Sequence, residues 1–122
     1  MPEPDRFTAA YLHGIYIPQD LQDCFREIEK LWDAGQKAEA KALAEKDFVG
    51  KSHFGLGGWM RNNWQFWGGS RLSRYFNELG LKHPDDMSGL ILKSYHRYLH
   101  GRPLELETEI KRYQDYWNNL PQ

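Results

Sequence analysis

Apolar residues recur every three or four positions along most of this 122-residue chain, and this spacing constrains the fold more than any other feature. The pattern runs through residues 21–32, 72–79, 87–99 and 106–120. Such a spacing places the apolar side chains on one face of an α-helix, which has 3.6 residues per turn. The sequence therefore predicts an all-α or mainly α fold in which each helix buries one face against its neighbours.

The whole chain fits one compact bundle of about five or six helices, with residues 1–122 forming a single domain. Residues 1–17 are predicted to form an extended N-terminal arm whose distal end packs on the bundle, with room for a small strand. After Pro18, the first helix is expected to end at Gly35, because glycine is common just past helix C-termini. Residues 36–46, rich in Ala, Lys and Glu, predict a further helix on the surface.

The net charge of −1 gives the chain no global field that would attract nucleic acid or an acidic membrane. Nucleic acid is therefore a disfavoured partner, although basic residues near tryptophans suit single-strand stacking. No apolar run approaches the ~20 residues of a membrane span, and the N-terminus lacks the pattern of a signal peptide. Cys24, the single cysteine, lies on an apolar helix face and is predicted to be a buried thiol. We expect a cytoplasmic protein without a membrane partner.

Residues 53–74 form the most informative stretch for function. Taken as one helix, residues 53–67 carry three tryptophans on a broad apolar face, whereas Arg61 and Asn62 fall on the opposite face. The three glycines within residues 55–58 lower helix stability, so the backbone there is predicted to be approached closely. Another helix is the favoured neighbour. A ligand, or a helix that begins later, is the alternative.

The string Gly68-Gly-Ser-Arg71 is predicted to begin the next helix, with Ser70 as its N-cap. A second interpretation stays open, because two glycines before a helix can aim backbone N–H groups at an anion. Arg71 and Arg74 would then help to hold that anion. The turn and cap are favoured, since the spacing is not that of a phosphate-binding loop.

Two histidine-bearing segments allow both a structural and a chemical interpretation. His83-Pro-Asp85-Asp86 is typical of a helix start, yet a histidine with two carboxylates can also bind metal or transfer protons. His96 and His100 are one helical turn apart, a spacing that can chelate zinc, but no third ligand is evident. No metal and no cofactor are therefore predicted. His96 is expected either in a polar cleft or in a core hydrogen-bond network.

Between Ile17 and Trp117 the chain resembles a family of small bacterial proteins catalogued as a domain of unknown function. The resemblance rests on several strings, among them His53-Phe-Gly-Leu-Gly, Arg61-Asn-Asn-Trp64, Gly69-Ser-Arg-Leu72, His83-Pro-Asp-Asp-Met-Ser88 and Ser94-Tyr-His-Arg-Tyr98. It implies an intracellular protein of bacterial type. It supplies no activity, cofactor or site residue.

Two classes of function follow from these patterns. The favoured one is a small cytoplasmic binding protein that recognises a protein partner or a small anionic ligand. The alternative is a small enzyme for a phosphate-bearing or nucleotide-like substrate, in which arginines hold the anion and histidines transfer protons. The candidate ligand-binding residues are polar side chains with a possible role beyond the core: His53, Arg61, Asn62, Ser70, Arg71, His83, Asp86 and His96. The oligomeric state and any catalytic residue stay open.

Overall fold

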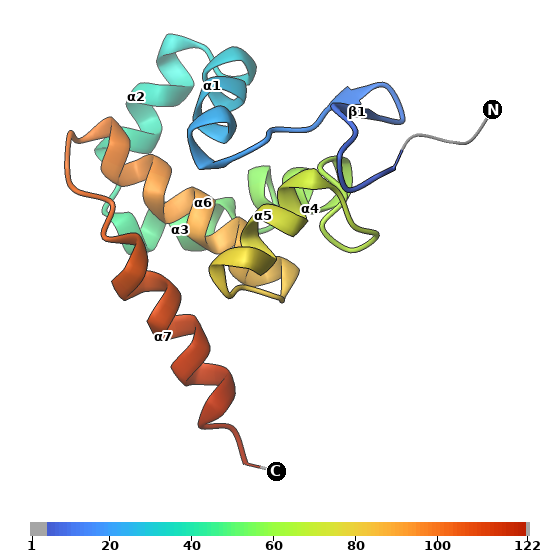
Figure 1. The fold of residues 1–122 in the computed structure, drawn as a ribbon. Helices are drawn as coiled ribbons and strands as arrows, with labels where there is room; N and C mark the ends of the chain where they lie inside the picture. Colours follow the sequence, from blue (N-terminus) through green and yellow to red (C-terminus); the bar gives the residue numbers. More distant parts are fainter. Residues whose placement is uncertain (1–4, 122) are drawn as a thin grey trace.

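The computed structural model describes residues 5–121, and this part of the chain is mainly α-helical (Figure 1). It contains a two-stranded hairpin and seven helices: β1 (Tyr11–Leu12), β2 (Ile15–Tyr16), α1 (Leu21–Leu31), α2 (Ala34–Ala42), α3 (Glu45–Ser52), α4 (Leu56–Asn63), α5 (Arg71–Leu79), α6 (Pro84–Leu99) and α7 (Leu106–Asn118). The predicted mainly α class is confirmed. The predicted number of five or six helices is wrong.

The helix boundary predicted at Gly35 lies two residues earlier, at Asp33, which caps α2. The Asp33 carboxylate accepts the Gln36 N–H at 2.8 Å, and the Gln36 side chain accepts the Asp33 N–H at 3.0 Å. This reciprocal pair is a capping box, which fixes a helix start. Gly35 therefore lies in the first turn of α2 rather than after the end of α1, contrary to the prediction.

The extra helix is α3, which begins inside the stretch predicted as one helix over residues 36–46. The backbone is extended at Leu43 and Ala44, so that α2 ends before them and α3 begins after them. His96 of α6 and His100, the C-cap of α6, bind carbonyls at this corner: Nε2 of His96 lies 2.7 Å from the Leu43 oxygen, and Nε2 of His100 lies 3.0 Å from the Lys41 oxygen. A carbonyl only accepts, so both imidazoles donate. Side chains of α6 thus satisfy carbonyls at the end of α2.

The prediction of a single helix over residues 53–67 is also wrong. Only α4 is helical there, and the chain turns after Asn63, with Gln65 in the left-handed region at φ 58°. The turn separates two tryptophans that the helix had placed on one face: Trp64 is buried, whereas Trp67 is 62% exposed. Arg61, predicted on an exposed face, is only 8% exposed.

Helix α6 is the centre of the fold, because α1 to α5 and α7 all contact it (Figure 1). Its middle, residues 90–92 and Tyr95, is fully buried. A helix surrounded in this way needs apolar residues on most of its circumference, and Ile91 and Leu92 supply adjacent ones. Cys24 of α1 is buried in the same core, as predicted, and burial raises the pKa of its thiol.

The N-terminal arm carries the small strand that the sequence allowed. β1 and β2 pair antiparallel, with Tyr11 opposite Tyr16. Arg71 of α5 fastens the chain just beyond the hairpin, since its guanidinium donates to the Ile17 carbonyl, 2.8 Å from Nε. The arm prediction for residues 1–4 lies outside the described residues.

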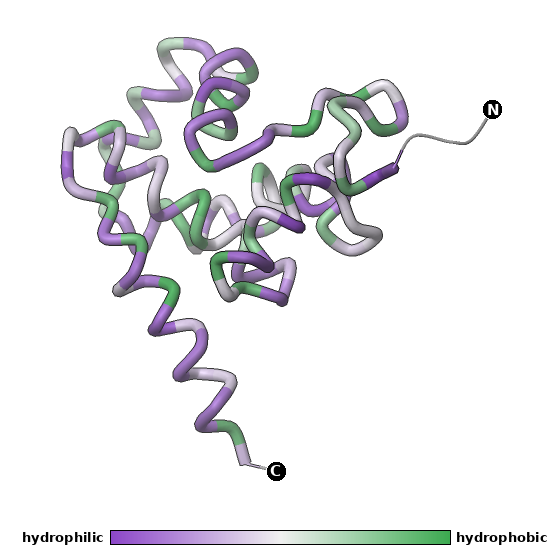
Figure 2. The backbone as a smooth tube through the Cα atoms, viewed as in Figure 1, coloured by the Kyte–Doolittle hydropathy of each residue, from purple (hydrophilic) through white to green (hydrophobic). Residues whose placement is uncertain are grey.

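Helix α7 projects from the body of the molecule, and short hydrophobic stretches alternate with hydrophilic ones along it (Figures 1 and 2). Its first half is anchored by Ile110 and by Glu109, which are both buried. Among residues 5–121, no helix has both the length and the apolar character that crossing a membrane requires.

Candidate functional site

Arg61 is engaged in holding the fold together. Its Nη1 donates to Ser88 Oγ at 2.8 Å and its Nη2 donates to the His53 carbonyl at 2.9 Å. Its Nε lies 3.5 Å from Asp85 Oδ1. The guanidinium thus joins the α3–α4 turn to the first turns of α6, and each of its nitrogens already faces a partner within the chain.

The Gly-Gly-Ser-Arg string forms the predicted helix cap. Ser70 accepts the Ser73 N–H at 3.2 Å, and Ser73 Oγ accepts the Ser70 N–H at 2.8 Å. Ser70 also donates to the Trp64 carbonyl at 2.7 Å, which joins the cap to the end of α4. Arg71 points toward the Ile17 carbonyl instead of toward this turn.

His83 forms the N-cap of α6, because its Nδ1 accepts the Asp85 N–H at 3.1 Å. Asp86 accepts the indole N–H of Trp117 at 2.7 Å, and the rings of His83 and Trp117 stack with 5.2 Å between their centroids. These residues therefore tie α6 to the outer half of α7. Asn62 lies exposed on α4, and its backbone carbonyl accepts a hydrogen bond from the Gln65 side chain at 3.2 Å.

His96 lies 12 residues beyond Pro84 along α6, which separates it by about 18 Å from the start of that helix. It is buried in the core network that was one of its two predicted environments. Within the described range, no group of three or more His, Cys, Asp or Glu residues is arranged to hold a metal ion. The structure thus gathers His53, Arg61 and the start of α6 at one place and leaves His96 elsewhere.

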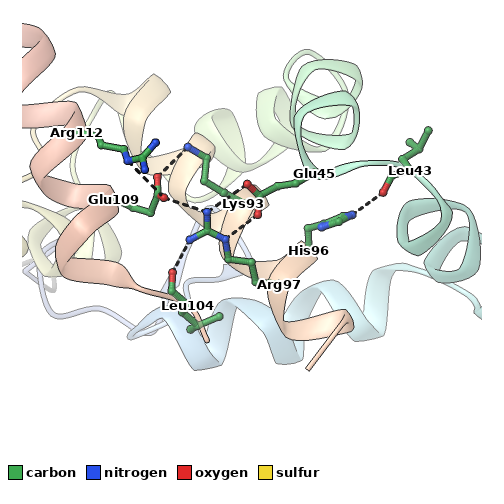
Figure 3. Close-up of polar contacts among 8 residues, drawn as sticks. All are labelled: Leu43, Glu45, Lys93, His96, Arg97, Leu104, Glu109 and Arg112. Carbon is green, nitrogen blue, oxygen red and sulfur yellow. Dashed lines mark hydrogen bonds and ion pairs between the residues drawn. The ribbon is translucent and has the colours of Figure 1, made fainter. Parts of the chain in front are cut away.

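Next to His96, an ion-pair network links α3, α6 and α7 (Figure 3). Arg97 donates to both carboxylate oxygens of Glu45, at 2.7 and 3.2 Å, and to Glu109 at 3.0 Å. Lys93 donates to the other oxygen of Glu109 at 3.0 Å. Burial of Glu109 favours its neutral form, but the hydrogen bonds from Lys93 and Arg97 outweigh this, so that the pKa of Glu109 is lowered. The network fastens α7 to the body.

Helices α1 to α4 enclose an apolar groove that none of the predicted site residues lines. It has a volume of about 530 Å³ and runs between the α1–α2 corner on one side and α3 with the start of α4 on the other. We call it the tryptophan groove. Its apolar lining is Leu31, Trp32, Ala40, Leu43, Phe48, Leu56 and Trp59.

The floor of the tryptophan groove is rigid and its edge is open. Phe48 is buried, and the Trp32 ring meets it edge-on with 6.1 Å between the ring centroids. Trp59 packs edge-on against the buried Trp64 at 5.6 Å. Leu31, at the rim, is 47% exposed. The groove therefore offers solvent a fixed aromatic surface, a feature typical of binding sites.

Charged residues stand on opposite sides of the groove. Glu39 comes from α2 and Lys51 from α3, and both are exposed. Within residues 5–121, neither takes part in an ion pair. Each can therefore pair with an opposite charge on a bound molecule.

The sequence patterns missed this groove, because they treated apolar residues as core. One signal was present: Leu31 and Trp32 are adjacent, and neighbouring positions on a helix lie 100° apart, so that both are buried only where other elements cover a wide part of the helix. Val49 and Phe48 are a second adjacent pair in a short helix. Only the arrangement of four helices shows which of these side chains stay uncovered.

A family model described as a domain of unknown function, DUF6794, matches residues 17–99. The match takes in α1 to α6 and leaves out the hairpin and α7. Comparison with curated proteins and with solved structures found no match. Because the family model covers more than half of the sequence, the chain belongs to the family of this domain of unknown function, DUF6794.

Proposed function

We propose that this domain is a binding protein without catalytic activity, and that its tryptophan groove holds an amphipathic helix of a protein partner. The observation that carries the proposal is the groove itself: an open hollow of about 530 Å³ walled by two half-buried tryptophans and floored by the core. Apolar grooves between helices commonly receive the apolar stripe of a partner helix, with side chains one turn apart as anchors.

Tryptophan walls suit this role energetically. Trp and Tyr are enriched among the residues that contribute most to protein–protein affinity, since a rigid ring buries a large apolar area with little loss of conformational entropy. Trp32 and Trp59 lie on opposite walls of the groove and are held by ring contacts from below. A partner would therefore meet preorganised walls, which lowers the entropic cost of binding.

The two rim charges define the chemistry of the partner. Glu39 can form an ion pair with a basic residue on one flank of the bound helix, and Lys51 can form an ion pair with an acidic residue on the other flank. Opposite charges on the two rims fix the direction in which a helix with one basic and one acidic flank can lie. The proposed partner is thus an apolar stripe with lysine or arginine on one side and glutamate or aspartate on the other.

The position of the groove within the chain supports a role in binding for the matched family domain itself. All residues that line it fall between Leu31 and Trp59, inside the matched range of 17–99. The enzymatic alternative has less support, because Arg61 and Arg71, its proposed anion holders, donate to groups of the chain itself.

A charge-reversal experiment tests the proposal. The probe is a synthetic helix of about 18 residues with a leucine stripe, lysines on one flank and glutamates on the other; this length allows partial helicity in isolation. We expect it to bind the native chain and to bind the variant Lys51→Glu about tenfold more weakly, because one flank then meets a like charge in whichever direction the peptide lies. Fluorescence anisotropy of the labelled peptide measures both affinities.

The matched control is a peptide with the same leucine stripe and lysines on both flanks. This second peptide should prefer the Lys51→Glu variant, which has two acidic rims, over the native protein, and a mere loss of folding cannot produce that preference. If both peptides bind both proteins equally, binding does not depend on the charges of the rim and the proposal is wrong. The proposal is also wrong if a peptide of scrambled sequence binds with the same affinity.

A further inference from the structure

A second cleft, separate from the tryptophan groove, lies between the α5–α6 loop and the outer half of α7. Its volume is about 720 Å³, within the range of small-molecule sites. Residues 80–84 form one side, and Tyr113, Gln114, Trp117 and Asn118 of α7 form the other. Asp86 contributes from the first turn of α6. We call it the α7 cleft.

Two rings of the α7 cleft are fixed in place before any ligand arrives. His83 and Trp117 stack with an interplanar angle of 23°. The His83 Nδ1 accepts the Asp85 N–H, and the Trp117 indole donates to Asp86. Trp117 nevertheless stays 45% exposed. The cleft therefore presents a held, partly uncovered indole, on which a flat ring can stack.

The side chains of Lys82 and His83 supply donors to the α7 cleft. In the neutral imidazole of His83 the proton must be on Nε2, because Nδ1 is an acceptor. Lys82 takes part in no ion pair with any residue of the described chain. The carboxylate of Asp86 is already engaged by the indole of Trp117. The Nε2–H of His83 and the ammonium of Lys82 can thus donate to an acceptor on a ligand, and the positive charge of Lys82 favours an anionic ligand.

The backbone of α6 does not supply this anion site. Pro84 has no N–H, the Asp85 N–H donates to the His83 ring, and the N–H groups of Asp86 and Met87 donate to the His83 carbonyl. An anion would therefore be held by side chains, with Lys82 as the charged one. The amide groups of Gln114 and Asn118 line the opposite wall.

We propose that the α7 cleft binds a planar aromatic carboxylate, whose ring stacks on Trp117 and whose carboxylate pairs with Lys82 and the Nε2–H of His83. This site is independent of the partner helix assigned to the tryptophan groove. The wall formed by residues 80–86 lies inside the matched family range, and the α7 wall lies outside it.

Three ligands of similar size separate the contributions of ring and charge: indole-3-acetate, its neutral counterpart indole-3-ethanol, and cyclohexylacetate, which keeps the acid and lacks the aromatic ring. Titration followed by ¹H–¹⁵N NMR reports the site directly, because the hydrogen-bonded indole N–H of Trp117 is one observable signal. Indole-3-acetate should shift that signal and bind about tenfold more tightly than either of the other two.

The Lys82→Gln variant keeps an exposed polar side chain and should fold normally. It should weaken indole-3-acetate about tenfold and leave indole-3-ethanol unchanged. Lys46→Gln, an exposed lysine on α3, is the matched control and should change neither affinity. The proposal is overturned if indole-3-acetate at millimolar concentration leaves Trp117 unshifted, if it shifts Trp32 or Trp59 instead, or if indole-3-ethanol binds equally well.

Discussion

Single polar residues that stand out in this sequence mostly hold the fold together. Arg61 shows this best, because an arginine in a glycine- and tryptophan-rich segment suggests anion binding, yet its donors go to Ser88 and the His53 carbonyl. A buried guanidinium with three partners joins segments that are distant in sequence. The sequence context of Arg61 thus suggests a role in ligand binding, whereas its contacts in the fold are structural.

Replacement of Arg61 by alanine should lower the free energy of unfolding by about 2–3 kcal/mol, because it leaves Ser88 and the His53 carbonyl without their charged donor. Urea unfolding at neutral pH measures the change. Arg74→Ala is the control, since this exposed arginine only pairs with Glu78 one turn away and should matter by less than about 0.5 kcal/mol. Equal effects of the two variants would contradict the role given to Arg61.

Gly50 and Gly57, which both lie inside short helices, differ in how much space surrounds them. A Cβ at Gly57 would lie 3.1 Å from the Ser52 carbonyl and 3.1 Å from the Arg61 Nη1, whereas a Cβ at Gly50 would meet nothing. Gly57→Ala should therefore destabilise the protein by about 1 kcal/mol, despite alanine's better helix propensity. Gly50→Ala should stabilise it by about 0.5–1 kcal/mol. Thermal unfolding of the two variants should thus move in opposite directions.

Elements were predictable where their signals are local. The stripe of Leu72, Phe76 and Leu79 with Gly80 behind it corresponds to α5, whose end has Gly80 at φ 103°. The break before α2 was predicted about two residues too late, at Gly35, and the break between α2 and α3 was missed. The Asp33 capping box sets the position of the first break, and the second depends on His96, which is 53 residues away from Leu43.

The docking of α7 is an element-scale feature with a pH dependence. The folded-state pKa of Glu109 is below its ordinary value near 4.5, so the folded protein binds fewer protons than the unfolded chain as pH falls. The stabilisation from Glu109 is therefore present above pH 4.5 and is lost as pH falls through the folded pKa. Glu109→Gln should remove about 2 kcal/mol at pH 7 and less at about pH 3.5.

Denaturant unfolding of the native protein and Glu109→Gln at both pH values measures this difference. Glu107→Gln is the matched control, because Glu107 is exposed in the same helical turn. It should cost less than about 0.5 kcal/mol at either pH. A Glu109→Gln effect that is the same at both pH values would show that the charge of Glu109 does not fasten α7.

For the whole molecule, the sequence allowed prediction of a mainly helical fold and of a buried Cys24, but not of the binding surface. Periodicity predicts that Trp32 and Trp59 lie on apolar helix faces, although Trp32 is in fact the extended C-cap of α1. It does not show that α2 and α3 diverge enough to leave both rings half uncovered. Groove formation depends on the relative placement of four helices, which is set by contacts across the chain such as those of His96 and Arg97.

The central claim is that the tryptophan groove is the protein-binding surface of this domain. Its most direct test is NMR titration of the native chain, Leu31→Glu and Leu79→Glu with the amphipathic peptide. Both leucines are partly exposed, but only Leu31 lines the groove. We predict shifts of the Trp32 and Trp59 indole signals in the native protein and in Leu79→Glu, and their loss in Leu31→Glu. Equal binding by both variants, or shifts confined to Trp117, would contradict the account.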